Sequence, residues 1–158
     1  AAGLLTDHLL QGKPIAYNHF GQPIVPSDPD IHISLSHTGD WVFCAIGDSP
    51  IGLDAQMLSP LNRGVINRIF SAPEQDVKSD DDFTRIWTHK EAYYKLCGSV
   101  PLSTISKTNF SRTTQYDEFT GCYYQHARFN DSIHITACVR QEASLPTEII
   151  TLELSDII

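Results

Sequence analysis

Positive charge is scarce in this sequence. Its 158 residues hold 11 lysines and arginines against 19 aspartates and glutamates, which gives a formal net charge of −8. Non-specific binding to nucleic acid or to an anionic membrane needs a basic surface. We therefore expect neither partner, and any polyanionic ligand must be held by basic side chains gathered at one place.

Cysteine and long apolar runs are scarce too. The cysteines lie far apart without a C-x-x-C pair, which argues against a zinc site or a disulfide framework and favours free thiols in a reducing cytoplasm. No uncharged run approaches the ~18 apolar residues of a membrane-spanning helix. With 41% apolar and 19% charged residues, the chain has the composition of a globular domain. We expect a cytoplasmic protein with a packed core.

Strand-like runs occur in two groups. Those at 31–36, 41–46 and 50–54 are separated by the turn sequences HTGD and GDS, which predicts an antiparallel meander. Further strands are expected at 104–110, 121–129, 132–139 and 148–154.

Helical patterns stand between these groups. A helical period covers 61–70, and Ser71 and Glu74 have the spacing of a capping box. A long helix is expected at 81–97, because it begins in an aspartate cluster and is followed by Gly98. Strand runs with segregated helices predict an α+β fold in which antiparallel strands pack with a long helix.

The long helix carries charge in an unusual place. At about 100° per residue, Lys90 falls on its apolar stripe, while Glu91 and Lys95 lie one turn apart on the adjoining stripe. One interpretation is that the Lys90 stem covers the core, its ammonium reaches water, and Glu91 and Lys95 form an ordinary surface pair. The alternative is that all three residues border a site.

A second acidic residue favours a site. The sequence IGLD ends a strand at Asp54, where its carboxylate could share a cation with Glu91 on the helix. Magnesium is typically held by one or two carboxylates together with substrate phosphates. Lys90 and Lys95 could then neutralise the phosphate charge beside the metal.

Three stretches in this order carry a family resemblance: GQPIVPSDPDIHISLSH, IGLD and WTHKEAYYK. They resemble the motifs of the 4′-phosphopantetheinyl transferases of the larger, surfactin-synthetase-activating type, namely a G-K-P loop leading to S-H, then G-[IV]-D, then W-x-x-K-E-A-x-x-K. The resemblance implies transfer of the phosphopantetheine arm of coenzyme A to a serine of an acyl, peptidyl or polyketide carrier protein. It also implies dependence on Mg²⁺, with Mn²⁺ as a substitute.

The resemblance assigns roles to individual residues. Asp54 and Glu91 correspond to the metal ligands, and Lys95 to the lysine on the coenzyme A pyrophosphate. Lys90 or Glu91 would assist deprotonation of the attacking serine. Two further positions, Ser36 and His37, would contact the 3′-phosphate end of coenzyme A.

Two positions depart from the family pattern. Gln22 stands where the G-K-P loop has its basic residue, so this contact to coenzyme A lacks a charge. Gln56 stands where many relatives carry a carboxylate near the metal. An amide oxygen can coordinate a cation or hold a water, but it adds no negative charge.

The resemblance further implies two pseudo-symmetric lobes. Residues 1–48 would be the remainder of the N-terminal lobe, and residues 49–158 the C-terminal, metal-binding lobe. Because the first residue is Ala1 rather than Met, we expect preceding residues to complete the N-terminal lobe and give a monomer. The alternative is completion of the fold by self-association.

Two other function classes stay open at this stage. A Mg²⁺-dependent hydrolase of a nucleotide-like pyrophosphate would use the same acidic and basic side chains. A non-catalytic module that binds coenzyme A or a carrier protein would fit the neutral Gln22 and Gln56.

The remaining histidines have no partner spacing, so surface positions are expected for His32, His89, His126 and His134, and core positions for Trp41 and Trp87.

Overall fold

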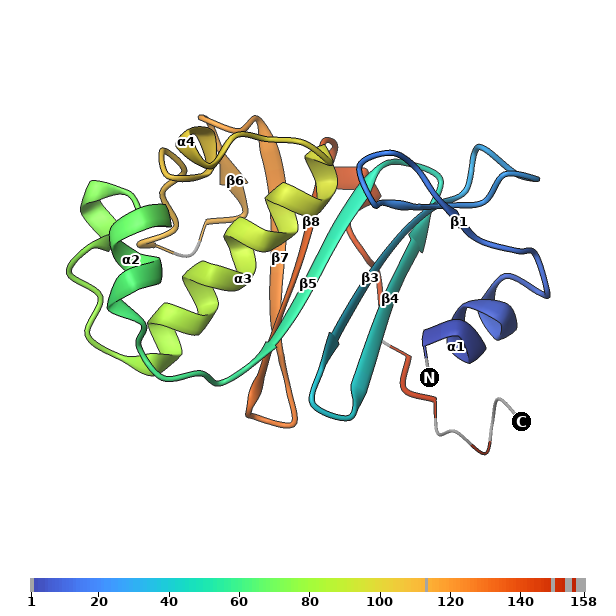
Figure 1. Ribbon diagram of the computed structural model, residues 1–158, viewed down its shortest axis with the longest axis horizontal. Coiled ribbons are helices and arrows are strands. Elements are labelled where there is room, and N and C mark those ends of the chain that lie inside the picture. Colours follow the sequence, from blue (N-terminus) through green and yellow to red (C-terminus); the bar gives the residue numbers. More distant parts are fainter. Residues whose placement is uncertain (1, 113, 149, 153–154, 156–158) are drawn as a thin grey trace.

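Two antiparallel sheets lie side by side in the computed structural model, which describes residues 2–112, 114–148, 150–152 and 155 (Figure 1). The first has the strand order β1-β2-β3-β4 and the second β5-β8-β7-β6. The strands are β1 (Ala16–Tyr17), β2 (Pro23–Ile24), β3 (His32–Thr38), β4 (Trp41–Gly47), β5 (Ile51–Met57), β6 (Tyr116–Asp117), β7 (Cys122–Phe129) and β8 (Ile133–Val139).

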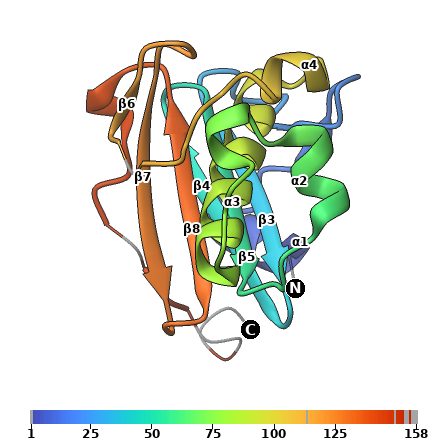
Figure 2. The same ribbon diagram turned by 90° about the vertical axis from the view of Figure 1, so that its left-hand side faces the viewer.

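Helices lie beside both sheets. The long helix α3 packs on one face of the second sheet, with α2 and α4 beyond it, and α1 lies next to β4 (Figures 1 and 2). The helices are α1 (Ala2–Leu9), α2 (Arg63–Ile69), α3 (Asp80–Cys97) and α4 (Leu102–Ile105), with 3-10 turns η1 (Ala72–Glu74) and η2 (Glu142–Ser144). The α+β class with antiparallel strands and a long helix is confirmed. None of the helices in the described ranges has the length and apolar character of a membrane span.

The meander expected from residues 31–54 is only half correct. Strands β3 and β4 pair antiparallel, with His32 opposite Gly47. Strand β5 leaves that sheet and pairs with β8, so that Ile51 lies opposite Val139. Leu53 packs in the apolar cluster between the sheets, and residues 51–55 are all buried. β5 is the end strand of the second sheet, but its other edge faces β3, so it lies in the interior of the molecule.

Side-chain hydroxyls join β3 to β5. At every second residue of β3, a hydroxyl accepts a hydrogen bond from a backbone N–H of β5, at 2.9 to 3.0 Å. The pairs are Ser34 with Leu53, Ser36 with Ala55 and Thr38 with Met57. The residue numbers rise together along both strands, so β3 and β5 run parallel. Hydroxyls therefore satisfy amides that a neighbouring strand would otherwise bond.

Helix α3 has well-defined ends. The Ser79 side chain accepts a hydrogen bond from the N–H of Asp82, and Gly98 follows the last turn with a φ of 73°. Both are common helix-capping arrangements, and the sequence-based bounds are correct to within one residue. The capping box of Ser71 and Glu74 is confirmed too, although it opens a 3-10 turn rather than an α-helix.

Three expectations about local structure are wrong. Residues 104–110 form no strand, because α4 and a loop occupy this stretch. Glu148 and residues 150–152 are likewise outside any strand, and the rest of the expected strand at 148–154 falls outside the described residues. Trp41 is 36% exposed on edge strand β4, where its ring meets Phe129 edge-on.

Gly52 allows α3 to approach β5 closely. A Cβ atom at this position would lie 2.0 Å from the carbonyl oxygen of Ala92 and 2.6 Å from the backbone nitrogen of Leu96. Backbone atoms cannot rotate away as a side chain can, so only glycine fits without moving the helix.

We expect Gly52→Ala to lower the free energy of unfolding by about 3 kcal/mol or more, because it forces the helix off the sheet. Urea denaturation would measure the change. Gly47→Ala is the matched control, since its Cβ would meet nothing closer than 3.8 Å. Equal stability of the two variants would contradict this account of the packing.

Candidate functional site

Asp54 is the centre of the candidate site. It projects from the middle of β5 and is 2% exposed. Its Oδ1 accepts hydrogen bonds from the Ser36 hydroxyl at 3.1 Å and from the Lys95 ammonium at 2.8 Å. Its Oδ2 accepts one from the Gln56 amide at 3.1 Å. A buried carboxylate needs such donors, and it is held in one orientation by them.

Lys95 connects this carboxylate to the first sheet. Its Nζ lies 2.8 Å from Asp54 Oδ1 and donates to the carbonyl of Leu35 on β3 at 3.2 Å. The Lys95 side chain is 28% exposed. The ammonium thus lies where three elements meet, namely β3, β5 and α3, and it is within reach of a ligand from solution.

Glu91 lies one helical turn before Lys95 and is half-buried. Burial raises the pKa of its carboxyl above the ordinary value, the negative charge of Asp54 raises it further, and the Lys95 ammonium opposes both. Hydrogen bonds bring together four residues predicted from the sequence, namely Ser36, Asp54, Gln56 and Lys95. Glu91 lies on the same helix as Lys95, and this helix packs on β5.

The donor set fits a hard divalent cation. Asp54 and Glu91 supply two carboxylates, and Gln56 supplies an amide whose oxygen is a further hard donor once its side chain turns. Among the described residues there is no cluster of three or more His, Cys, Asp or Glu that could hold a metal alone. Such a two-carboxylate site suits Mg²⁺ when phosphate oxygens of a substrate complete the shell.

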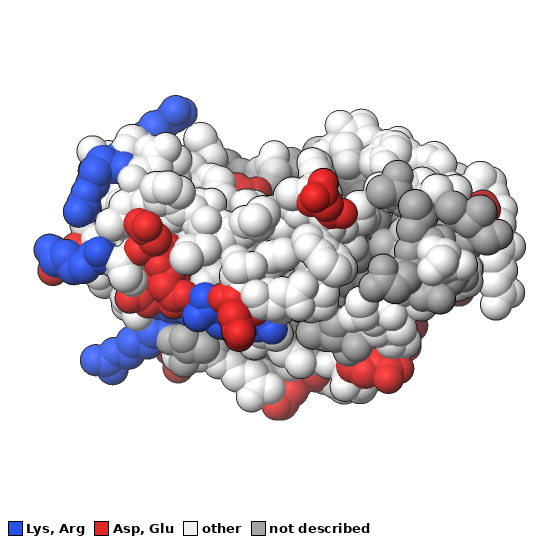
Figure 3. Space-filling view, turned by 90° about the horizontal axis from the view of Figure 1, so that it is seen from below, with Lys and Arg blue, Asp and Glu red and all other residues white. Residues whose placement is uncertain are grey.

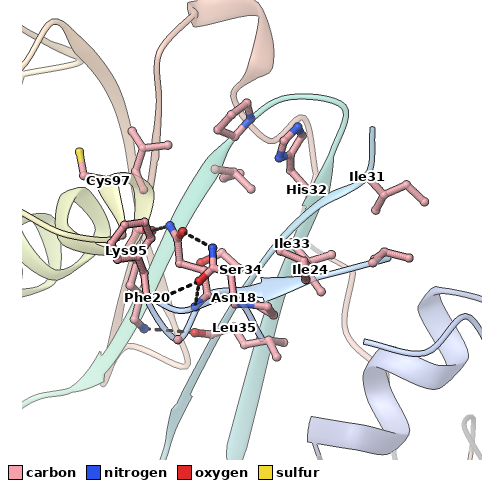
Figure 4. A pocket seen from close by; sticks show the side chains of 18 of the residues that line it. Asn18, Phe20, Ile24, Ile31, His32, Ile33, Ser34, Leu35, Lys95 and Cys97 are labelled. Atoms are coloured by element: carbon pink, nitrogen blue, oxygen red, sulfur yellow. Dashed lines mark hydrogen bonds between the residues drawn. The ribbon is translucent and has the colours of Figure 1, made fainter. Parts of the chain in front are cut away.

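A groove of about 610 Å³ opens beside Lys95, between the β1–β3 segment and the end of α3 (Figure 4). Gln22 lies on it and closes the end of the helix, because its amide donates to the Lys95 carbonyl at 2.8 Å and accepts from Asn18 at 2.9 Å. Residues on its apolar side include Ile24, Ile31, Ile33 and Pro29.

The neighbouring residues Ser36 and His37 point to opposite faces of β3. Ser36 is 5% exposed, and its hydroxyl is engaged with Asp54 and with the N–H of Ala55. His37 is exposed. The two side chains therefore leave β3 on opposite faces, and their contacts with coenzyme A stay predictions.

Lys90 does not lie with the other site residues. Its ammonium is 2.8 Å from Glu74 Oε2, and it donates to the carbonyl and hydroxyl of Thr108, both at 2.9 Å. The residue is 1% exposed, so the ammonium neither reaches water nor borders Asp54, unlike both positions expected from the sequence. Burial lowers the pKa of Lys90 and the charge of Glu74 opposes that shift.

Glu74 gives this buried pair its structural role. Its Oε1 accepts from the N–H of Phe110 at 2.6 Å and its Oε2 from the N–H of Ser71 at 2.7 Å. The ion pair thus ties η1 and the loop after α4 to the inner face of α3. The sequence predicted the capping role of Glu74. It did not predict the ion pair with Lys90, which lies on α3.

We expect Lys90→Met to lower the free energy of unfolding by about 3–5 kcal/mol, because it leaves the Glu74 carboxylate buried without a counter-ion. The double variant Lys90→Met/Glu74→Gln should recover a large part of that loss. Urea denaturation at neutral pH would measure both. A single variant as stable as the native protein would show that the buried pair contributes nothing.

A histidine cluster under α3 was not foreseen. His89 and His134 are each 1% exposed, so the expected surface positions are wrong for both. His126 Nε2 lies 3.0 Å from His134 Nδ1, and His134 Nε2 lies 3.2 Å from Asp81 Oδ1 without hydrogen-bond geometry. Burial lowers the pKa of His89 to about 3 and that of His126 to about 4. These histidines lie on three separate elements, so their spacing in the sequence does not predict that they meet.

Acid should destabilise the protein through this cluster. The unfolded chain takes up protons near the ordinary histidine pKa of 6.5, while folded His89 and His126 stay neutral down to about 3 and 4. The contribution of these two histidines to the free energy of unfolding is therefore fully present above pH 6.5. It falls as the pH drops towards 4, by up to about 1.4 kcal/mol per pH unit for each histidine.

Urea denaturation of the native protein and of His126→Gln at pH 7, 6 and 5 would test this. The variant should lose less stability on acidification, because one neutral histidine is gone. His19→Gln, at an exposed position, is the matched control and should follow the native protein. A native stability that does not change between pH 7 and 5 would contradict the expectation.

Comparison with known proteins identifies the family. The model of the family described as 4′-phosphopantetheinyl transferase superfamily matches residues 50–138. The chain is 32% identical over 148 residues to the 4′-phosphopantetheinyl transferase psf-1 of Bacillus pumilus, covering 84% of this chain and 64% of the relative.

Two further relatives match shorter stretches. Identity is 35% over 97 residues to the 4′-phosphopantetheinyl transferase Sfp of Bacillus subtilis (strain 168), covering 55% of this chain and 43% of the relative. It is 31% over 117 residues to the 4′-phosphopantetheinyl transferase AcpT of Escherichia coli (strain K12), covering 67% and 60%. The matches thus span less than two thirds of each relative.

Proposed function

The chain belongs to the 4′-phosphopantetheinyl transferase superfamily, and on that premise we propose that it transfers the 4′-phosphopantetheine arm of coenzyme A to a serine of a carrier protein. The contact of Asp54 with Lys95 beside a groove, with Glu91 one helical turn before Lys95, is the observation that carries the proposal. The carrier would be an acyl, peptidyl or polyketide carrier protein.

Asp54 and Glu91 would hold the Mg²⁺ ion, or Mn²⁺ in its place, with Gln56 as a neutral third donor. Bound there, the ion would neutralise charge on the pyrophosphate as the bond to phosphorus breaks. Lys95 supplies a second positive charge at the same place. Phosphoryl transfer depends mainly on positioning and on charge neutralisation, which these side chains can provide.

Glu91 is also the proposed acceptor of the proton from the carrier serine. A carboxylate has two oxygens, so one could hold the ion while the other accepts the proton. Lys90 would act in this mechanism only by fixing α3, since its ammonium is bound to Glu74. The serine oxygen forms the new bond to phosphorus, and adenosine 3′,5′-bisphosphate leaves.

Coenzyme A would lie along the groove between Gln22 and Lys95. The neutral Gln22 would contact it by hydrogen bonds, and the exposed His37 would contact the 3′-phosphate. Ser36 would act on the same ligand through its hold on Asp54. We also propose the division into lobes at residues 1–48 and 49–158, which the change of sheet between β4 and β5 supports.

Charge is unevenly spread over the molecule. Lys13 is the only lysine or arginine before Arg63, and it is paired with Asp28 at 2.7 Å. Basic side chains gather towards the end at which α2 stands, with acidic side chains among them (Figure 3). We propose that a carrier, an acidic protein in many cases, docks near the basic side chains at that end.

Intact-mass spectrometry of an apo carrier protein, incubated with this protein, coenzyme A and Mg²⁺, tests the proposed reaction. The carrier should gain the mass of phosphopantetheine. Release of free phosphopantetheine without any carrier would identify a hydrolase instead. Binding of coenzyme A without either product would identify a non-catalytic binding module.

In that assay, we expect Asp54→Asn and Glu91→Gln to slow transfer by roughly 10²–10⁴, because each removes a charged ligand from the metal. Asp40→Asn, on the exposed turn between β3 and β4, is the matched control and should retain the native rate. Near-native transfer by either site variant, with an intact fold, would rule out the catalytic reading.

We expect Gln56→Glu to strengthen binding of Mg²⁺ in the absence of coenzyme A, because it adds a third carboxylate near the ion. Turnover need not rise, since the new charge also repels the pyrophosphate. Calorimetric titration of both proteins, each with and without coenzyme A, measures this. Equal affinity in all four titrations would place residue 56 outside the metal site.

A further inference from the structure

Lys95 already places a positive charge on the proposed metal ligand. Its ammonium lies 2.8 Å from Asp54 Oδ1, the contact distance of a strong charge-assisted hydrogen bond. The carboxylate is 2% exposed, so this contact is only weakly screened by water. A cation that binds Asp54 must therefore compete with a covalently attached cation of the same chain.

Asp54 offers no unengaged oxygen to an incoming ion. Ser36 and Lys95 both donate to Oδ1, and Gln56 donates to Oδ2. A second hydrogen bond fixes the Ser36 hydroxyl, because its oxygen accepts the N–H of Ala55 at 3.0 Å. The Gln56 amide is neutral and can turn away at small cost. The charged contact with Lys95 is therefore the strongest obstacle to a metal ion.

The Lys95 backbone is held, whereas its side chain is partly exposed. The Lys95 carbonyl accepts the Gln22 amide at 2.8 Å, which anchors the end of α3. The side chain itself is 28% exposed, and its other partner is a single carbonyl, that of Leu35, at 3.2 Å. The ammonium also lies on the groove, where a phosphate group could reach it.

We propose that Lys95 acts as an internal counter-ion that opposes metal binding at Asp54, and that a pyrophosphate-bearing ligand in the groove draws it away. Metal and ligand then bind cooperatively, since each favours the conformation in which Lys95 has left Asp54. This inference rests on the proposed function for the identity of the ligand, coenzyme A. The contact with Lys95 thereby opposes metal binding in the absence of substrate.

Titration with Mn²⁺, followed by its electron paramagnetic resonance signal, tests the competition. We expect Lys95→Met to bind Mn²⁺ about tenfold or more tightly than the native protein when coenzyme A is absent. Lys107→Met removes the same charge at an exposed position after α4, and it should bind Mn²⁺ as the native protein does. Native affinity in Lys95→Met would overturn the proposal.

Coupling is tested by repeating the titrations with coenzyme A and subtracting the Mn²⁺ that coenzyme A binds by itself. Coenzyme A should tighten Mn²⁺ binding to the native protein by a larger factor than it does in Lys95→Met. An equal factor in both proteins would overturn the coupling.

Movement of the ammonium can be observed directly by NMR. The amide resonance of Ser36 is sensitive to the hydrogen bond on the preceding carbonyl, that of Leu35. Coenzyme A with Mg²⁺ should shift this resonance in the native protein. The shift in Lys95→Met should be much smaller. An unshifted native resonance in the complex would contradict departure of Lys95.

These measurements fail separately from the proposed function. If Lys95→Met binds Mn²⁺ more tightly but no carrier gains mass, the transferase function is overturned and the competition on Asp54 is supported. If the carrier is modified but Lys95→Met binds Mn²⁺ as the native protein does, the function stands and the internal counter-ion is overturned.

Discussion

The close contact between β5 and α3 at Gly52 is the constraint on which the site depends. It sets the helix directly against the strand, so that residues from both elements meet without a layer of side chains between them. Asp54 lies one strand repeat beyond Gly52, on the same face, and Lys95 reaches it from the facing helix. A larger residue at 52 would separate these charges and would open the buried carboxylate to water.

The sequence predicted features that depend on local pattern. The ends of α3 follow from Ser79 and Gly98, and the grouping of Asp54 with Lys95 was expected from the order of the motifs. Pairings between distant segments were not predictable in this way. The partner of β5 is β8, far along the chain, and alternation of apolar residues alone cannot distinguish it from the nearer β4.

Buried polar groups limited the prediction most. Lys90 has the spacing of a site residue, yet its ammonium is bound to Glu74, which had been assigned only a local capping role. Neutral histidines under the same helix looked like surface residues because their neighbours come from three separate elements. In each case the deciding fact is which side chain lies opposite, and a pattern of polar and apolar residues does not contain that information.

The hydroxyl contacts between β3 and β5 have a consequence for how the molecule opens. Backbone ladders hold each sheet together, whereas side chains alone make the junction between the sheets: the hydroxyls of Ser34, Ser36 and Thr38, and the apolar cluster around Leu53. We therefore expect the halves to part as intact units, with a free energy lower than that of global unfolding. The amides of Leu53 and Ala55 bond to hydroxyls of β3 and not to a strand of their own sheet. Hydrogen exchange at these two amides would therefore report separation of the halves, and not unfolding of either sheet.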